Sequence, residues 1–289
     1  LHAMSRRQRQ MCIRDSSGGW PQGWGQRTAV MGVINVTPDS FSDGGRFLAS
    51  ERALAEAQRQ LSRGADVLDL GAQSTRPGAE EVGAEEELRR LLPALNAIRQ
   101  HCPEALISVD TFLAPVAAKA LEAGANWIND VSGGRRDPNL LRVVADAGCP
   151  VVLMHSRGDS QTMDQLTTYA DVVADVKEAL LERSEAAIQA GVDESQSIWD
   201  PGLGFAKTHE QNLQLLRDLE QLTAGPRPVL IGPSRKRFIG AVLDEPRPKA
   251  RLWGTAAVAC RCAQAGAAVL RVHDVGPISQ TLRMAAALW

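Results

Sequence analysis

The amino-acid sequence predicts an α/β protein built as a single-domain (β/α)8 barrel of parallel strands. Short, continuously apolar runs alternate with amphipathic segments from residue 29 to the C-terminus, and such runs are typical of strands buried on both faces. Eight strand–helix pairs in a body of about 260 residues favour a barrel over an open sheet. No linker divides the 289 residues, and a hydrophobic content of 44% is enough for a large core.

The elements follow from the same patterns in chain order. The expected strands are short apolar runs, at 29–34, 65–70, 105–109, 126–128, 150–153, 197–199, 228–231 and 268–270. The expected helices carry apolar residues at helical spacing, at 48–64, 85–101, 115–123, 140–147, 169–190, 213–222, 251–265 and 278–288. Gly64, Gly124 and Gly148 are suitable helix stops. Residues 158–168 form the one polar insertion and are predicted to be a mobile loop.

The first residues of the chain differ in composition from the rest. Residues 1–16 contain four arginines without apolar periodicity, and we predict a non-native or disordered tail there, with the barrel domain spanning 17–289.

The net charge of −2 argues against a nucleic-acid or membrane-surface partner. No apolar run approaches the roughly 18 residues that a membrane helix needs, so a soluble protein is expected. The five cysteines form no Cys-x-x-Cys pair and are expected to be free thiols of a reducing cytoplasm, with disulfides as the alternative.

The first strand runs into an unusually polar loop. The stretch from Met31 to Arg46 reads Met-Gly-Val-Ile-Asn-Val-Thr-Pro-Asp-Ser-Phe-Ser-Asp-Gly-Gly-Arg. Pro38 and the turn-forming residues after it cannot continue the strand. The loop carries many hydrogen-bonding groups beside one aromatic residue, Phe41, which favours a functional loop over a simple connector.

Polar side chains follow every expected strand. They are Asn35, then Asp69 with Thr75 and Arg76, Asp110, Asn129 with Asp130, Met154 with His155, Asp200, Ser234 to Lys236, and Arg271 with His273. Taken singly, each is typical of a turn, a helix cap or a solvated charge. In a barrel, however, the carboxyl ends of all strands meet on one face, where barrel enzymes have their active sites. The set therefore predicts a site there.

The residue types also indicate a ligand. Asp110, Asn129 and Asp200 suit a flat heterocycle rich in N–H donors, because a carboxylate accepts two parallel hydrogen bonds from an aminopyrimidine edge. The basic residues Arg76, Arg271 and His273 suit a polyanion such as diphosphate. Asn35, with Asp69 as a further candidate, offers the oxygen ligands that Mg²⁺ prefers. The chain has no nucleotide-binding glycine loop, so side chains and loops are expected to hold phosphate.

The stretch from Met31 to Arg46 resembles the signature of the dihydropteroate synthases, folate-pathway enzymes that join a pterin to p-aminobenzoate. The family's remaining motifs are matched in order at 69–78, 108–111, 128–130, 200–205, 232–236 and 271–274. The second of the family's loops, at 69–78, departs from the usual pattern, with Ala72-Gln73 where Gly-Glu is more common.

The resemblance implies a role for each site residue. The pterin would be held by Asp110, Asn129, Asp200 and Lys236, with Met154 lining its pocket. Diphosphate and Mg²⁺ would be bound by Asn35, Arg76, Arg271 and His273. The p-aminobenzoate would be bordered by Phe41, Thr75, Pro77 and Ser234. The resemblance further implies a cytoplasmic homodimer that is a sulfonamide target.

The implied reaction transfers the pterin methylene from diphosphate to the aniline nitrogen of p-aminobenzoate, by a Mg²⁺-assisted and largely dissociative substitution. Lys236, Arg271, His273 and Arg76 would act electrostatically on the charge of the departing diphosphate. Two alternatives remain: a pterin methyltransferase domain of the corrinoid type, and a catalytically inactive pterin-binding subunit. The acceptor-type loop argues against the first, and the presence of Lys236, Arg271 and His273 argues against the second.

Overall fold

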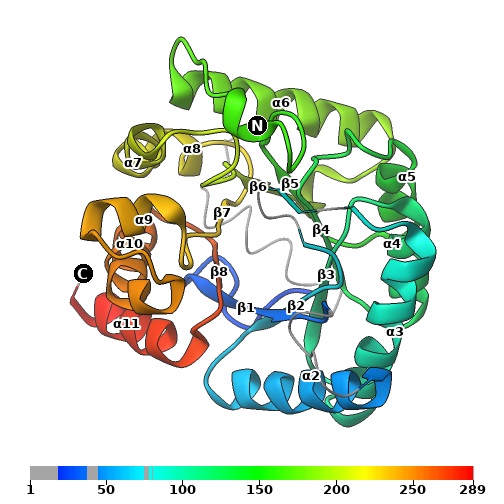
Figure 1. The fold of residues 1–289 in the computed structure, drawn as a ribbon. Coiled ribbons are helices and arrows are strands. Elements are labelled where there is room, and N and C mark those ends of the chain that lie inside the picture. The colour runs from blue at the N-terminus through cyan, green and yellow to red at the C-terminus, as the bar shows by residue number, and fades with distance from the viewer. Residues whose placement is uncertain (1–18, 38–44, 75–77, 80, 289) are drawn as a thin grey trace, which may run out of the picture.

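The computed structural model describes residues 19–37, 45–74, 78–79 and 81–288, and these form the predicted barrel (Figure 1). One parallel sheet has the strand order β6-β5-β4-β3-β2-β1-β8-β7. A bridge between Trp199 and Val229 joins its two edges and closes the ring. The strands are β1 (Ala29–Asn35), β2 (Val67–Gly71), β3 (Leu106–Asp110), β4 (Trp127–Asp130), β5 (Val151–Met154), β6 (Ser197–Asp200), β7 (Leu230–Ile231) and β8 (Val269–Val272).

Helices surround the ring of strands on its outside (Figure 1). They are α2 (Gly45–Ser62), α3 (Ala84–His101), α4 (Ala114–Glu122), α5 (Asn139–Ala147), α6 (Val172–Gln189), α7 (His209–Arg217), α8 (Glu220–Thr223), α9 (Arg237–Leu243), α10 (Leu252–Gln264) and α11 (Val275–Leu288). Among the described residues, 3-10 turns lie between the helices at η3 (Met163–Gln165), η4 (Glu194–Gln196) and η5 (Pro248–Arg251).

The sequence-based helix boundaries are wrong in two places. The helix expected at 213–222 is two helices, because Thr208 and Gln211 cap a helix that starts earlier, at His209, and ends at Arg217. The short helix α9 was not expected at all, since no side chain caps its start and Gly240 lies inside it. The polar insertion at 158–168 contains the turn η3, which buries Met163.

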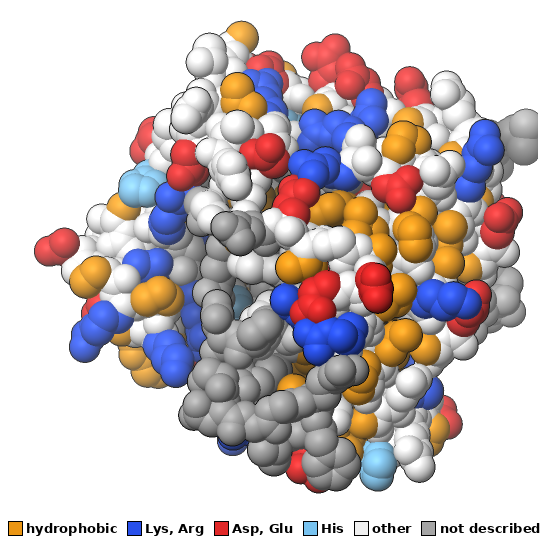
Figure 2. Space-filling model, turned by 45° about the vertical axis from the view of Figure 1, so that its right-hand side comes forward, with side chains coloured by type: hydrophobic (Ala, Val, Ile, Leu, Met, Phe, Trp, Pro, Cys, Tyr) orange, Lys and Arg blue, Asp and Glu red, His pale blue; other side chains and the backbone are white. Residues whose placement is uncertain are grey.

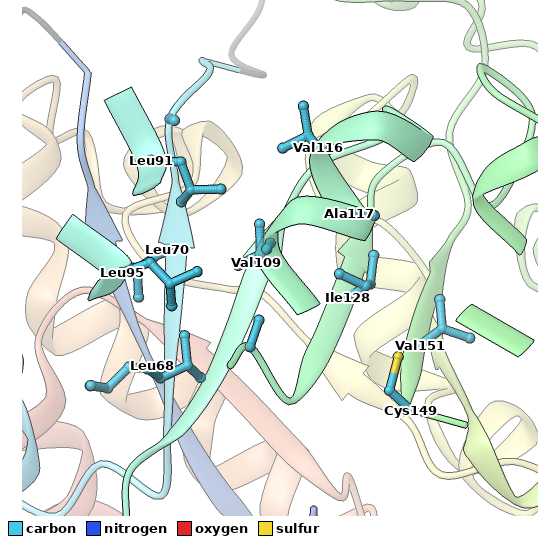
Figure 3. Packing of buried hydrophobic residues seen from close by; sticks show 14 of the residues in the cluster. Leu68, Leu70, Leu91, Leu95, Val109, Val116, Ala117, Ile128, Cys149 and Val151 are labelled. Atoms are coloured by element: carbon cyan, nitrogen blue, oxygen red, sulfur yellow. The ribbon is translucent and has the colours of Figure 1, made fainter. Parts of the chain in front are cut away.

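The strands bury side chains on both faces. One residue from each of seven strands packs with its counterparts inside the barrel, and we call this set the apolar layer: Met31, Val67, Trp127, Val152, Ile198, Leu230 and Val269. The intervening residues point outward to the helices, as Leu68 and Leu70 of β2 do towards Leu91 and Leu95 of α3 (Figure 3). Each such side chain contributes about 1.5–3 kcal/mol by burial, so this outer layer anchors the strands firmly.

Aromatic residues before β1 close the barrel below the apolar layer. Trp20 and Trp24 lie with ring centroids 5.3 Å and 5.9 Å from that of Trp127. The Nε1 of Trp127 also donates to the carbonyl oxygen of Gly19 at 2.6 Å. The plug of the barrel is therefore built from residues that immediately precede the first strand.

The described surface carries mixed charge. On the face in Figure 2, acidic and basic side chains alternate with apolar ones, without a large field of one sign. Among the described residues, no helix is long and apolar enough to cross a bilayer. Cys102, Cys149, Cys260 and Cys262 are free thiols, which confirms the expectation for these four cysteines.

Candidate active site

The polar site lies on the same inner face of the strands as the apolar layer, one step further along each strand. Side chains two residues apart on a strand point to the same face. Two residues after members of the apolar layer come the residues that we call the site layer: Asp69, Asn129, Met154, Asp200 and Arg271. Asn35 and Asp110 lie at the ends of β1 and β3, and the parallel register places Asn35 beside Gly71, Gly71 beside Asp110, and Asp110 beside Asn129.

Arg271 joins two buried carboxylates across the barrel. Its Nε donates to Asp69 Oδ2 at 2.6 Å, and its Nη2 donates to Asp110 Oδ2 at 2.7 Å. Asn129 Nδ2 donates to the same oxygen of Asp69 at 3.3 Å. Burial lowers the pKa of Arg271, but Asp69 and Asp110 outweigh it and keep that pKa above its ordinary value. The guanidinium of Arg271 therefore stays charged and holds Asp69 and Asp110 together.

The same cluster leaves acceptors without donors. Burial raises the pKa of Asp110 to about 7, although Arg271 acts in the opposite direction. Oδ1 of Asp69 and Oδ1 of Asp110 are buried without a hydrogen-bond partner among the described residues. Because buried acceptors are almost always paired, the Oδ1 of Asp110, which lies nearer the mouth, indicates a place for the N–H donor of a ligand. Asp69 itself is 0% exposed and bound to Arg271, so it does not offer the open Mg²⁺ ligand that the sequence left as a candidate.

Asp200 is oriented by the loop that follows β6. Its Oδ1 accepts a hydrogen bond from the backbone N–H of Gly202 at 2.7 Å. Burial raises the pKa of Asp200, while the Gly202 N–H and Lys236 act against this. Gly202 has a φ of +68°, and a Cβ there would lie 2.0 Å from the carbonyl oxygen of His155. The close approach therefore requires glycine. Met154 is 3% exposed and pairs with Asp200 in the β5–β6 register, where it lines the same wall.

Lys236 reaches the site from the end of the loop after β7. Its Nζ lies 4.3 Å from the centre of the Phe205 ring, within cation–π distance. Burial lowers the pKa of Lys236 to about 8, and Asp200 opposes this. The Phe205 ring and the Asp200 carboxylate both favour the charged form of Lys236.

Ser234 and His273 come together at the ends of β7 and β8. Ser234 Oγ accepts from the backbone N–H of His273 at 3.1 Å and lies 3.0 Å from its Nδ1. Arg235 and Asp274 reinforce this junction with two hydrogen bonds, at 3.0 Å and 2.7 Å. The pair is therefore held beside Arg271, at the mouth of the barrel.

Asn35 offers an oxygen ligand for a cation. Its Oδ1 lies 3.8 Å from the position that a Cβ on Gly71 would occupy, beside Asp110 at the mouth. Among the described residues, no cluster of three or more His, Cys, Asp or Glu side chains forms a metal cage. One amide oxygen at a polar mouth fits Mg²⁺, which commonly takes few protein ligands and completes its shell with water and substrate phosphate.

The predicted site residues thus separate into two groups. The structure brings together Asn35, Asp110, Asn129, Met154, Asp200, Ser234, Lys236, Arg271 and His273 around one end of the barrel. Phe41, Thr75, Arg76 and Pro77 lie outside the described residues. The sequence did not indicate the buried Lys207 beside Asp200, because nothing in its local pattern distinguishes it from a surface lysine.

Comparisons with known proteins agree with this geometry. Residues 31–273 match the model of a family described as pterin binding enzymes. A dihydropteroate synthase of a Synechocystis species is 48% identical over 92% of this chain and 92% of its own length. A Xanthomonas albilineans dihydropteroate synthase structure with 4-aminobenzoic acid is 45% identical, covers 91% of this chain and 94% of its own, and has a TM-score of 0.86.

A Yersinia pestis dihydropteroate synthase structure with a sulfonamide drug is 39% identical, with a TM-score of 0.86 and coverage of 93% of this chain and 98% of its own. The family match at 31–273 includes every strand residue that lies in the site, from Asn35 to Arg271. The chain therefore belongs to the pterin-binding enzyme family, as a member of its dihydropteroate synthase group.

Proposed function

We propose that the chain condenses 6-hydroxymethyl-7,8-dihydropterin diphosphate with p-aminobenzoate to give 7,8-dihydropteroate and diphosphate. The observation that carries the proposal is the set of buried acceptors at the barrel mouth. Oδ1 of Asp110 has no hydrogen-bond partner in the described part of the chain, and the Asp200 carboxylate is held by Gly202. An aminopyrimidine edge supplies the N–H donors that such acceptors need. The synthase relatives and the 4-aminobenzoic acid bound to one of them support both substrates.

Pterin recognition is assigned to the inner side chains of the mouth. Asp200 accepts from the amino-pyrimidine edge, Asp110 and Asn129 bind the opposite side of the ring, and Met154 packs against its face. Lys236 donates to a ring acceptor, and the Phe205 ring beneath its ammonium restricts where that ammonium lies. Ser234 borders the p-aminobenzoate. The other residues expected there, Phe41, Thr75 and Pro77, lie outside the described part of the chain.

Asn35 would hold Mg²⁺ together with the substrate's phosphate oxygens, and the ion would supply neutralising charge for the diphosphate. Arg271 and His273 flank the same region, and Arg76 is expected to join them although it lies outside the described residues. Ser234 fixes the His273 ring by its contact with Nδ1.

The bond from the pterin methylene to the diphosphate oxygen breaks, and a bond from the aniline nitrogen to that methylene forms with loss of one amine proton. The electron-rich pterin stabilises positive charge on the methylene, which favours a largely dissociative path. Arg271 and His273 stabilise the negative charge that develops on the leaving group. No nucleophilic side chain is needed.

A direct assay tests the proposal. The purified chain, supplied with both substrates and Mg²⁺, should release diphosphate and form a product with the mass of 7,8-dihydropteroate. Asp200→Asn should lose most of this activity, whereas Lys249→Met, at an exposed lysine, should retain it. Absence of dihydropteroate with the folded native chain would reject the function. Methyl transfer from a methylated pterin to a corrinoid would favour the methyltransferase alternative instead.

A homodimer is proposed from the surface of α9, α10 and α11. Five of the exposed large apolar side chains lie on these helices: Val242, Leu243, Trp253, Met284 and Leu288. Trp253 is 78% exposed and lines one shallow hollow with Met284 and Leu288, and an exposed apolar surface of this kind favours a self-association site. Trp253→Glu should yield monomers in sedimentation velocity, while the matched change Leu181→Glu on α6 should not. A native chain that sediments as a monomer would reject the dimer.

The cellular setting is also a proposal. Free thiols at the four described cysteines favour a reducing compartment such as the cytoplasm. The sulfonamide bound to the Yersinia pestis relative supports competition between sulfonamides and p-aminobenzoate in this chain. A sulfonamide inhibition constant that does not rise with p-aminobenzoate concentration would contradict that competition.

A further inference from the structure

A buried lysine that the proposed reaction does not use lies beside Asp200, in the loop between β6 and α7. Lys207 is 6% exposed. Its Nζ lies 2.9 Å from His155 Nδ1, 3.1 Å from the carbonyl oxygen of Gly202 and 3.0 Å from that of Phe205. An ammonium group has three N–H donors, which these three partners match in number. Because a buried charge is costly without hydrogen bonds, the full set of partners shows that the side chain is held in one place.

His155 completes this set as a neutral imidazole. Burial lowers the pKa of His155 to about 2, and Lys207 acts in the same direction. A ring with its proton on Nε2 accepts at Nδ1 from the ammonium. Burial also lowers the pKa of Lys207 to about 7, against the effect of Asp200. If Lys207 were neutral, its amine would accept a hydrogen bond from an Nδ1–H of His155. Both protonation states of Lys207 therefore keep its hydrogen bond to His155.

The loop that Lys207 holds supports two parts of the site. Gly202, at one end, donates its N–H to Asp200 and so fixes the direction of that carboxylate. Phe205, at the other end, presents its ring to the ammonium of Lys236. The carbonyls of these same two residues are the ones that Lys207 binds. His155, on the segment after β5, provides the fixed point to which the loop is tied.

We propose that Lys207 is a positioning residue for the pterin, which ties the β6–α7 loop to His155 and thereby sets the Asp200 carboxylate and the Phe205 support of Lys236. The inference rests on the proposed function, because it takes Asp200 and Lys236 as pterin ligands. The three protein partners take up the N–H donors of Lys207, so this side chain acts through them and not on the substrate directly. Its loss should therefore weaken pterin binding and leave the acceptor step largely unaffected.

The test is calorimetric titration of 6-hydroxymethylpterin into the Lys207→Met variant. Methionine is an unbranched side chain of similar length, but it lacks the N–H donors of the lysine. We expect the Kd for 6-hydroxymethylpterin to rise about tenfold or more, because the buried hydrogen bonds that hold the loop are lost. The KM for p-aminobenzoate at saturating pterin diphosphate should stay within about twofold. Lys249→Met makes the same change at an exposed position and should bind as the native chain does. A folded Lys207→Met with native Kd overturns the inference.

A second pair of variants decides the matter if Lys207→Met does not fold. His155→Asn keeps an acceptor near the position of Nδ1, and His155→Leu removes it. We expect His155→Asn to bind 6-hydroxymethylpterin several-fold more tightly than His155→Leu does. Equal Kd values for the two variants would overturn the inference. A native chain that binds no pterin would reject the proposed function and this inference together. Native binding with unchanged affinity in the variants would reject the inference alone.

Discussion

Replacing Arg271 with methionine should destabilise the fold as well as impair the reaction, because its guanidinium neutralises two buried carboxylates. Asp69 is 0% exposed and Asp110 is 7% exposed, so neither regains hydration when the cation is removed. Breaking a buried ion pair from one side costs about 3–5 kcal/mol of unfolding free energy. The Arg271 side chain is 23% exposed, and partial screening by solvent places the expected loss near the lower end of that range, about 3 kcal/mol.

The loss in Arg271→Met should increase with pH. Asp110 has a pKa raised from 3.8 to about 7 by burial, with Arg271 opposing the rise. A carboxyl group whose pKa is higher in the folded state stabilises the fold below its unfolded pKa, and this contribution disappears as pH rises through the folded pKa. Without Arg271 the folded pKa of Asp110 rises further. The variant therefore continues to lose stability at pH values where the native chain has finished titrating this group.

Urea unfolding followed by tryptophan fluorescence measures both effects. The difference in unfolding free energy between native and variant should be larger at about pH 8 than at about pH 5.5. The double variant Asp69→Asn/Arg271→Met should be more stable than Arg271→Met alone, because it removes one of the two uncompensated charges. The reasoning is refuted if Arg271→Met matches the native stability at both pH values, or if the two substitutions are additive. The variant should also bind pterin weakly, since Arg271 positions Asp110.

Three further outcomes are expected. Asp200→Asn places a donor against a ring donor and should raise the Kd for 6-hydroxymethylpterin by about tenfold or more in calorimetry; an unchanged Kd would contradict its role. Trp24→Ala empties part of the plug and should lower the unfolding free energy by about 3–5 kcal/mol while both KM values stay native. Gly204→Ala, at a φ of +79° and with its Cβ 3.0 Å from Lys236 Cδ, should lower kcat and stability, the latter by about 1–2 kcal/mol. Gly83→Ala, where a Cβ meets nothing within 4 Å, lies at the start of α3 away from Lys236 and is the control for kcat, which should stay native.

Much of the barrel and its site could be predicted because short apolar runs alternate with amphipathic segments and polar residues follow each run. The carboxyl ends of the strands of a barrel meet on one face, so Asn129 and Asp200 could be placed at the mouth from the sequence. Helix boundaries were harder to predict from the sequence. Leucines continue at a spacing of three through 213–222, and this regular pattern hid the break at Asp218. The capping pair Thr208 and Gln211 is the signal that would have shown the true start.

The pairing of charges could not be predicted from the sequence. Arg271 was expected to bind the diphosphate with Arg76 and His273. The structure shows that it also reaches Asp69 and Asp110 on two other strands, 202 and 161 residues away in the chain. Lys207 likewise acquires its role from His155, 52 residues away, and from carbonyl groups, which carry no sequence signal. Such contacts depend on the closed barrel, which brings distant strand ends together.

The most direct test of the account is a crystal structure of the chain with Mg²⁺ and the pterin diphosphate bound. We predict that the aminopyrimidine edge lies within hydrogen-bond distance of Asp200, that Asp110 Oδ1 accepts from the ring, and that the diphosphate lies beside Asn35 and His273. A pterin bound elsewhere, or one turned so that Asp200 and Asp110 remain without ligand donors, would contradict the account.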